Sequence, residues 1–172
     1  MYSFVESLKL NLGLGVPADY IETIFDCITQ LAIGLEFAHS QGLIHGKLEL
    51  QNVLIQSDGT KGNVVYKINN FRPGSTRDAP LSSELNSWSF AKGNKRPFTE
   101  GEKVEILMLK DIYSLGICIL ELMIGRFSEN RYSITIDSLP LTWAEYPEST
   151  PLIQVLVECL NIDSISQRKG KL

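Results

Sequence analysis

The chain has 172 residues, of which 44% are hydrophobic and 21% are charged, and its formal net charge at pH 7 is −4. This size and composition allow one sizeable core, so we expect a single domain covering residues 1–172. The absence of a basic stripe argues against nucleic acid as a partner. The most apolar stretch, residues 112–124, contains Glu121 and is shorter than the roughly 20 residues of a membrane span.

The cysteines and the N-terminus indicate the compartment. Cys27, Cys118 and Cys159 are far apart in the sequence and each lies among apolar residues, which predicts reduced core thiols rather than disulfides. The N-terminus lacks the basic start and apolar run of a secretory signal. We therefore expect a cytoplasmic protein, with a place in a cytoskeletal or other large assembly left open.

A long helix is the first element that the pattern predicts. Apolar residues recur three and four positions apart between Pro17 and Ser40, as they do along one buried helix face. Pro17 suits the first turn, and Gly42 lies just past the end. His39, near the C-terminal end of this helix, is expected to be a dipole partner or a surface residue.

A small hairpin and a long loop follow. Residues 53–55 and 64–68 are short β-rich runs, and the segment between them is rich in turn-forming residues, which predicts an antiparallel hairpin. From residue 69 to residue 103 no period persists and glycine, proline, serine and asparagine accumulate. We expect a loop over this stretch, and loops of this length in compact domains are commonly functional or mobile.

Two helices are predicted in the second half. Residues 111–124 are helical in length and apolar on nearly every side, which predicts a buried central helix ended by Gly125. Residues 137–151 contain three prolines and are expected to be irregular. Residues 151–160 have the spacing of an amphipathic helix.

The segment from Gly42 to Ile55, GLIHGKLELQNVLI, can be aligned without gaps on the protein-kinase catalytic loop I-H-R-D-L-x-x-x-N, and it resembles that signature. The family's His, Leu and Asn positions are kept as His45, Leu48 and Asn52. Gly46 stands where the family has Arg, and Lys47 stands where it has the catalytic Asp.

The resemblance continues at the metal-binding D-F-G motif. Asn70 stands at the Asp position, Phe71 is retained, and Arg72 replaces the Gly. Asp111 to Gly116 resembles the start of the family's central buried helix. The remaining matches are Glu100 of the A-P-E position, Trp143, Tyr146-Pro147, Leu152, Val157, Cys159-Leu160, Asp163 and Arg168.

By this resemblance the fold is mainly α: a kinase-like C-terminal lobe, helical with a small β-hairpin beside the catalytic loop. The glycine-rich loop, the strand lysine and its helix-borne glutamate have no counterpart in the chain, so we expect the N-terminal lobe to be absent. Leu12-Gly13-Leu14-Gly15 is not a phosphate loop, because no strand precedes it.

The exchanges at the matched positions change the chemistry. Together Gly46, Lys47, Asn70 and Arg72 raise the formal charge of the site by about three units relative to the family pattern. Divalent cations are strongly disfavoured near added positive charge, so magnesium and ATP binding are predicted to be weak or absent. The alternative is metal-free attraction of phosphates by Lys47 and Arg72.

The resemblance also assigns structural roles. His45 and Phe71 match a stacked apolar column, Asp111 matches the residue that fixes the catalytic-loop backbone, and Leu54 matches the residue under adenine in active relatives. Glu100 and Arg168 match a buried ion pair. Asn52 is either a residual metal ligand or, as Asn often does in turns, a hydrogen-bond partner of the loop backbone.

Three hypotheses about function follow. The first is a catalytically inactive, pseudokinase-like module that acts as a scaffold or structural subunit for other proteins. The second is a fragment of a divergent serine/threonine-type kinase whose N-terminal lobe is encoded upstream. A third, related to the first, is a regulator that activates a kinase by lobe-to-lobe contact.

Overall fold

The structure, a computed structural model, describes residues 2–3, 18–57, 64–71, 99–125, 135–140, 143 and 145–161. The elements in chain order are β1 (Tyr2–Ser3), α2 (Ala18–Ser40), the 3-10 turn η1 (Leu50–Asn52), β2 (Val53–Ser57), β3 (Val64–Ile68), α4 (Glu100–Ile124), the 3-10 turns η3 (Ile136–Ser138) and η5 (Pro147–Ser149), and α5 (Thr150–Leu160).

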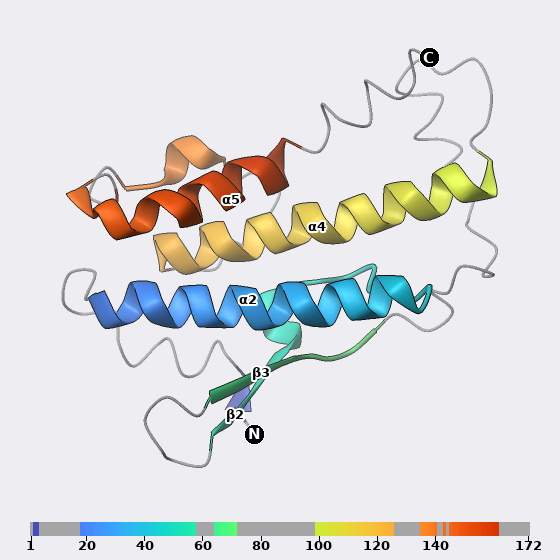
Figure 1. Cartoon of the computed structure of the whole chain (residues 1–172), viewed down its shortest axis with the longest axis horizontal. Helices are drawn as coiled ribbons and strands as arrows, with labels where there is room; N and C mark the ends of the chain where they lie inside the picture. The colour runs from blue at the N-terminus through green and yellow to red at the C-terminus, as the bar shows by residue number, and fades with distance from the viewer. Residues whose placement is uncertain are drawn as a thin grey trace.

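The elements form successive layers (Figure 1). The small sheet lies against one side of α2, α4 packs against the other side of α2, and α5 covers α4. The helix α4 is therefore central, as its apolar sequence predicts, because it is covered by one helix on each side. The mainly helical, kinase-like fold class predicted from the sequence is confirmed, with the hairpin beside the 44–52 loop.

The sheet has three antiparallel strands in the order β1-β2-β3. The predicted hairpin is β2 and β3, with Ile55 opposite Tyr66. The strand β1 was not predicted from the sequence; it has two residues and pairs Tyr2 with Ile55 on the outer edge of β2. A strand this short carries no alternating pattern, so periodicity could not find it.

Gln30 ties β3 to α2. Its side-chain Nε2 donates to the carbonyl oxygen of Val64 at 3.0 Å, and its Oε1 accepts from the backbone N–H of Tyr66 at 2.9 Å. One side-chain amide thus satisfies a backbone N–H and a backbone carbonyl of the edge strand β3, as a neighbouring strand would. This contact fixes the strand that leads into Asn69 and Asn70.

The helix α4 begins at Glu100, eleven residues before the predicted start and inside the stretch that was expected to be a loop. Its start is a capping box: the Thr99 side chain accepts from the Glu102 N–H at 3.3 Å, and the Glu102 carboxylate accepts from the Thr99 N–H at 2.7 Å. Thr-x-x-Glu is a sequence signal for a helix N-terminus that the analysis overlooked. The predicted end is confirmed, with Gly125 as C-cap in the left-handed conformation.

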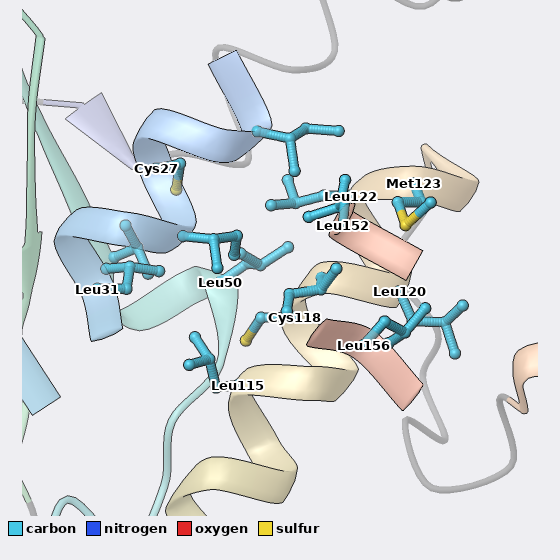
Figure 2. Packing of buried hydrophobic residues seen from close by; sticks show 14 of the residues in the cluster. Cys27, Leu31, Leu50, Leu115, Cys118, Leu120, Leu122, Met123, Leu152 and Leu156 are labelled. Atoms are coloured by element: carbon cyan, nitrogen blue, oxygen red, sulfur yellow. The ribbon is translucent and has the colours of Figure 1, made fainter. Parts of the chain in front are cut away.

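The core joins α2, η1, α4 and α5. Figure 2 shows Leu50 of η1 between Leu31 of α2 and Cys118 of α4, with Leu156 of α5 on the far side of α4. All four side chains have no more than 1% of their surface exposed. Leu48 is equally buried, so the 44–52 loop is anchored in the same core through two of its own leucines.

Two polar side chains of the core donate to backbone carbonyl groups of α4. The Tyr20 hydroxyl donates to the carbonyl oxygen of Leu122 at 2.7 Å, and Trp143 Nε1 donates to that of Met123 at 2.8 Å. Burial raises the pKa of Tyr20 to about 12, so its hydroxyl keeps the proton it donates. Trp143 has 1% of its surface exposed and is a core residue.

The cysteines are free and buried, as expected. Burial raises the pKa of the thiols of Cys27 and Cys159, which keeps them protonated and unreactive. No helix in the described part of the chain is both long enough and apolar enough to cross a membrane.

Gly116 sets the distance between α4 and α5. A methyl group at this position would lie 2.7 Å from Cβ of Cys159 and 3.1 Å from a methyl carbon of Leu160. The first contact is with an atom fixed to the backbone of α5, so a larger residue cannot be accommodated by rotating a side chain. Gly116 is therefore required by close packing.

We predict that Gly116→Ala lowers the free energy of unfolding by about 1–3 kcal/mol, because it overpacks the α4–α5 contact. Gly101→Ala is the matched control in the same helix: nothing lies within 4 Å of the added methyl, so stability should be unchanged or higher by up to about 1 kcal/mol. Urea unfolding of the three proteins measures the difference. Equal stability of the two variants would show that α4 and α5 do not pack this closely.

Candidate functional site

The 44–52 loop is held by the carboxylate of Asp111, which projects from α4 and is 1% exposed. Its Oδ1 accepts from the Gly46 N–H at 2.8 Å, and its Oδ2 accepts from the His45 N–H at 2.8 Å. The Oδ2 atom also lies 3.0 Å from Nε2 of His39. An ionised carboxylate can only accept, so Nε2 of His39 is the donor in this contact.

His39 is a site residue whose main contact was not predicted from the sequence. It lies in the last turn of α2, where a helix-dipole partner was expected, but its side chain is only 14% exposed and bonds to Asp111. The helix α2 thus contributes to fixing the loop. Spacing along the chain gives no signal for a contact between residues 72 positions apart.

The ring of His45 is fully buried and both of its nitrogens are engaged. Nδ1 accepts from the Lys47 N–H at 3.1 Å, so the ring proton of the neutral tautomer is on Nε2, which lies 3.0 Å from the carbonyl oxygen of Asn69. The ring also contacts Phe71, with centroids 4.7 Å apart and planes inclined by 53°. In this state His45 has no free nitrogen with which to take a proton from a substrate.

Gly46 occupies the position of the family's Arg and has φ of 72°. This left-handed conformation turns its N–H toward Asp111 and is strained for residues that carry a Cβ. Glycine at position 46 therefore allows the backbone conformation in which its N–H donates to Asp111.

Lys47 stands at the catalytic Asp position, and its ammonium group is paired. Nζ lies 3.3 Å from Oε1 of Glu49, and the lysine side chain is 66% exposed. Glu49 offsets the charge of Lys47, so the site carries less added positive charge than the three units expected from the matched positions. No carboxylate stands at position 47 itself.

Two amides stand at the positions of the metal ligands. Asn52 Nδ2 donates to the carbonyl oxygen of Lys47 at 2.9 Å, which leaves its Oδ1 to accept from Nδ2 of Asn70 at 3.2 Å. Asn70 has φ of 64°, a conformation that Asn tolerates better than most residues with a side chain. Each amide is thus engaged with the protein, and Asn70 presents a donor rather than an acceptor to Asn52.

Other predicted site residues are placed only in part. Leu54 lies on β2, half-buried, and pairs with Ser3 and Lys67. Phe71 is 36% exposed. Arg72 and Arg168 lie outside the described residues, and of Glu100 only the backbone, at the start of α4, is described. The predicted ion pair between Glu100 and Arg168 therefore stays a prediction.

The described contacts around Asp111, His45 and Asn52 position the backbone of the loop. Within the described ranges there is no group of three or more His, Cys, Asp or Glu side chains that could hold a metal ion. The amides of Asn52 and Asn70 are neutral and weaker ligands for magnesium than carboxylates.

Comparison with known proteins finds relatives of the kind that the motifs resemble. No protein-family model matches the chain. Pseudokinase OPG198 of vaccinia virus (strain Western Reserve) is 29% identical over 133 residues, which are 73% of this chain and 44% of that protein. The probable serine/threonine-protein kinase PknB of Lactococcus lactis is 28% identical over 120 residues, 70% of this chain and 18% of that protein.

A solved structure supports the fold. The crystal structure of a double mutant of the Mycobacterium tuberculosis PknI kinase domain superposes with a TM-score of 0.52 at 16% identity, covering 96% of this chain and 61% of that one. The homologues are protein kinases and pseudokinases, and the fold is that of a kinase domain in part. The chain spans less than half the length of the two relatives above.

We predict that Asp111→Ala lowers the free energy of unfolding by about 3 kcal/mol or more, because it leaves buried N–H groups of the loop without an acceptor. Asp137→Ala, at an exposed carboxylate of η3, is the control and should change stability by less than about 0.5 kcal/mol. Urea unfolding measures both. If the two variants lose the same stability, Asp111 does not hold the loop.

Proposed function

Because the homologues are protein kinases and pseudokinases and the fold is kinase-like, we propose that this chain is a catalytically inactive, kinase-like module that serves as a scaffold or structural subunit. The observation that carries the proposal is the residue at the position of the family's catalytic Asp. Lys47 replaces the catalytic Asp, and its ammonium group is bonded to Glu49, while its backbone is fixed by His45 and Asn52.

The two exchanges should lower the rate of phosphoryl transfer strongly. A missing general base alone typically lowers a rate by about 10²- to 10⁴-fold. Asn70 in place of the metal-binding Asp removes a charged ligand as well, and phosphoryl transfer depends on metal ions that neutralise the phosphates. The two exchanges act on different parts of the reaction, so neither compensates for the other.

The retained architecture supports a structural role. Asp111 still holds the loop backbone, and the ring of His45 still packs on Phe71. These contacts stabilise the fold and need no nucleotide. A chain that keeps the fold after losing the reactive groups can still present a surface to other proteins. The partners that we propose are therefore other protein subunits, and the compartment that we propose is the cytoplasm.

An alternative is a piece of a divergent serine/threonine-type kinase. It is favoured by the similarity to PknB of Lactococcus lactis, a probable serine/threonine-protein kinase. A glycine-rich loop and a strand lysine encoded upstream of Met1 would support this alternative. A module that activates a kinase would instead raise that kinase's rate when added to it.

We predict that the purified chain gains no thermal stability from ATP in the presence of magnesium, because the charged metal ligand and the base are both replaced. The measurement is the melting temperature with ATP and magnesium against ATP with EDTA. A clear magnesium-dependent rise would contradict the proposal and favour the kinase alternative.

The reverting double variant K47D/N70D is the control for this prediction. It restores both acidic positions, and if the missing carboxylates are the cause, it should gain metal affinity relative to the natural chain. Phosphate transfer to a generic substrate should stay absent, because two carboxylates do not supply the glycine-rich loop and strand lysine that have no counterpart in residues 1–172. Transfer by the unchanged chain would refute the proposed inactivity directly.

A further inference from the structure

Glu49 bridges Lys47 and the interior of the loop. Its Oε1 lies 3.3 Å from Nζ of Lys47 and also accepts from Nδ2 of Asn52 at 3.3 Å. Asn52 is 8% exposed, and the Glu49 side chain is 20% exposed. The carboxylate is therefore held from its inner side by a buried amide and meets the lysine on its outer side.

This anchoring distinguishes the pair from an ordinary surface ion pair. Exposed pairs contribute little because two long, mobile side chains must both be ordered. Here the Glu49 carboxylate is already positioned by Asn52, so only the lysine side chain has to be ordered. The main chain of Lys47 is fixed as well, by its N–H bond to Nδ1 of His45 and its carbonyl bond to Asn52.

The other titratable groups near the loop are engaged elsewhere. The carboxylate of Asp111 accepts from the backbone of His45 and Gly46, and His39 donates to it from α2. Among the described residues, Glu49 is the acidic group for which an ion pair with Lys47 is found. The ammonium of Lys47 is thus matched to one particular carboxylate of its own loop.

We propose that the ion pair with Glu49 keeps the Lys47 ammonium group from binding phosphate-bearing ligands. A lysine at the catalytic position could attract phosphates without a metal ion. Glu49 prevents this, because a phosphate approaching Lys47 must displace the carboxylate and then meet its negative charge. This inference concerns anions in the absence of metal and holds whether or not the chain acts as a scaffold.

The test is binding of pyrophosphate in EDTA, measured by calorimetry on the full chain at low salt. Glu49→Gln keeps the side-chain shape and removes the charge, and we expect it to bind pyrophosphate about tenfold more tightly than the natural chain. The gain should vanish in the double variant K47M/E49Q. Glu36→Gln, which removes an exposed carboxylate from α2, is the control for net charge and should leave binding unchanged.

Two results would overturn the proposal. One is a Glu49→Gln variant with unchanged affinity, and the other is a gain that persists in K47M/E49Q. If Glu49→Gln does not fold, the Lys47→Met variant tests the proposal instead. A lysine that is paired with Glu49 contributes nothing to pyrophosphate binding, so Lys47→Met should bind pyrophosphate as weakly as the natural chain. A lower affinity of Lys47→Met would refute the proposal. Magnesium-dependent ATP binding, in contrast, would overturn only the proposed function.

Discussion

The carboxylate of Asp111 is the contact on which the site depends. It is buried in α4, the central helix, and it accepts from two consecutive N–H groups of the 44–52 loop and from His39 of α2. One side chain therefore connects α2, the loop and α4. Leu48 and Leu50 place the same loop in the hydrophobic core, so polar and apolar contacts fix its backbone together. Burial without these acceptors would leave N–H groups unsatisfied, which is costly.

The polar groups of the loop are satisfied by one another. The imidazole of His45 binds the backbone on both sides, the amide of Asn52 joins Lys47 to Asn70, and Glu49 neutralises the ammonium of Lys47. A loop that completes its own hydrogen bonds is ordered before any ligand arrives.

The sequence predicted those parts of the structure that repeat or match a motif. The periodic helices, the hairpin and the approximate end of α4 at Gly125 follow from spacing and turn chemistry, and the kinase-like fold follows from the motifs. The early start of α4 was missed although Thr99 and Glu102 signal it. The contacts of His39 with Asp111 and of β1 with β2 could not be predicted, because they join residues far apart in sequence through geometry alone. Glu49 was overlooked because the charge count covered only matched motif positions.

The protein itself positions the 44–52 loop, without a nucleotide. Hydrogen exchange of the backbone amides of His45 and Gly46, measured with and without ATP and magnesium, is the decisive experiment. Both amides should be strongly protected in the ligand-free chain, because both donate to Asp111, and their protection should not change when ATP and magnesium are added. Weak protection that becomes strong only with ATP and magnesium would contradict this positioning of the loop.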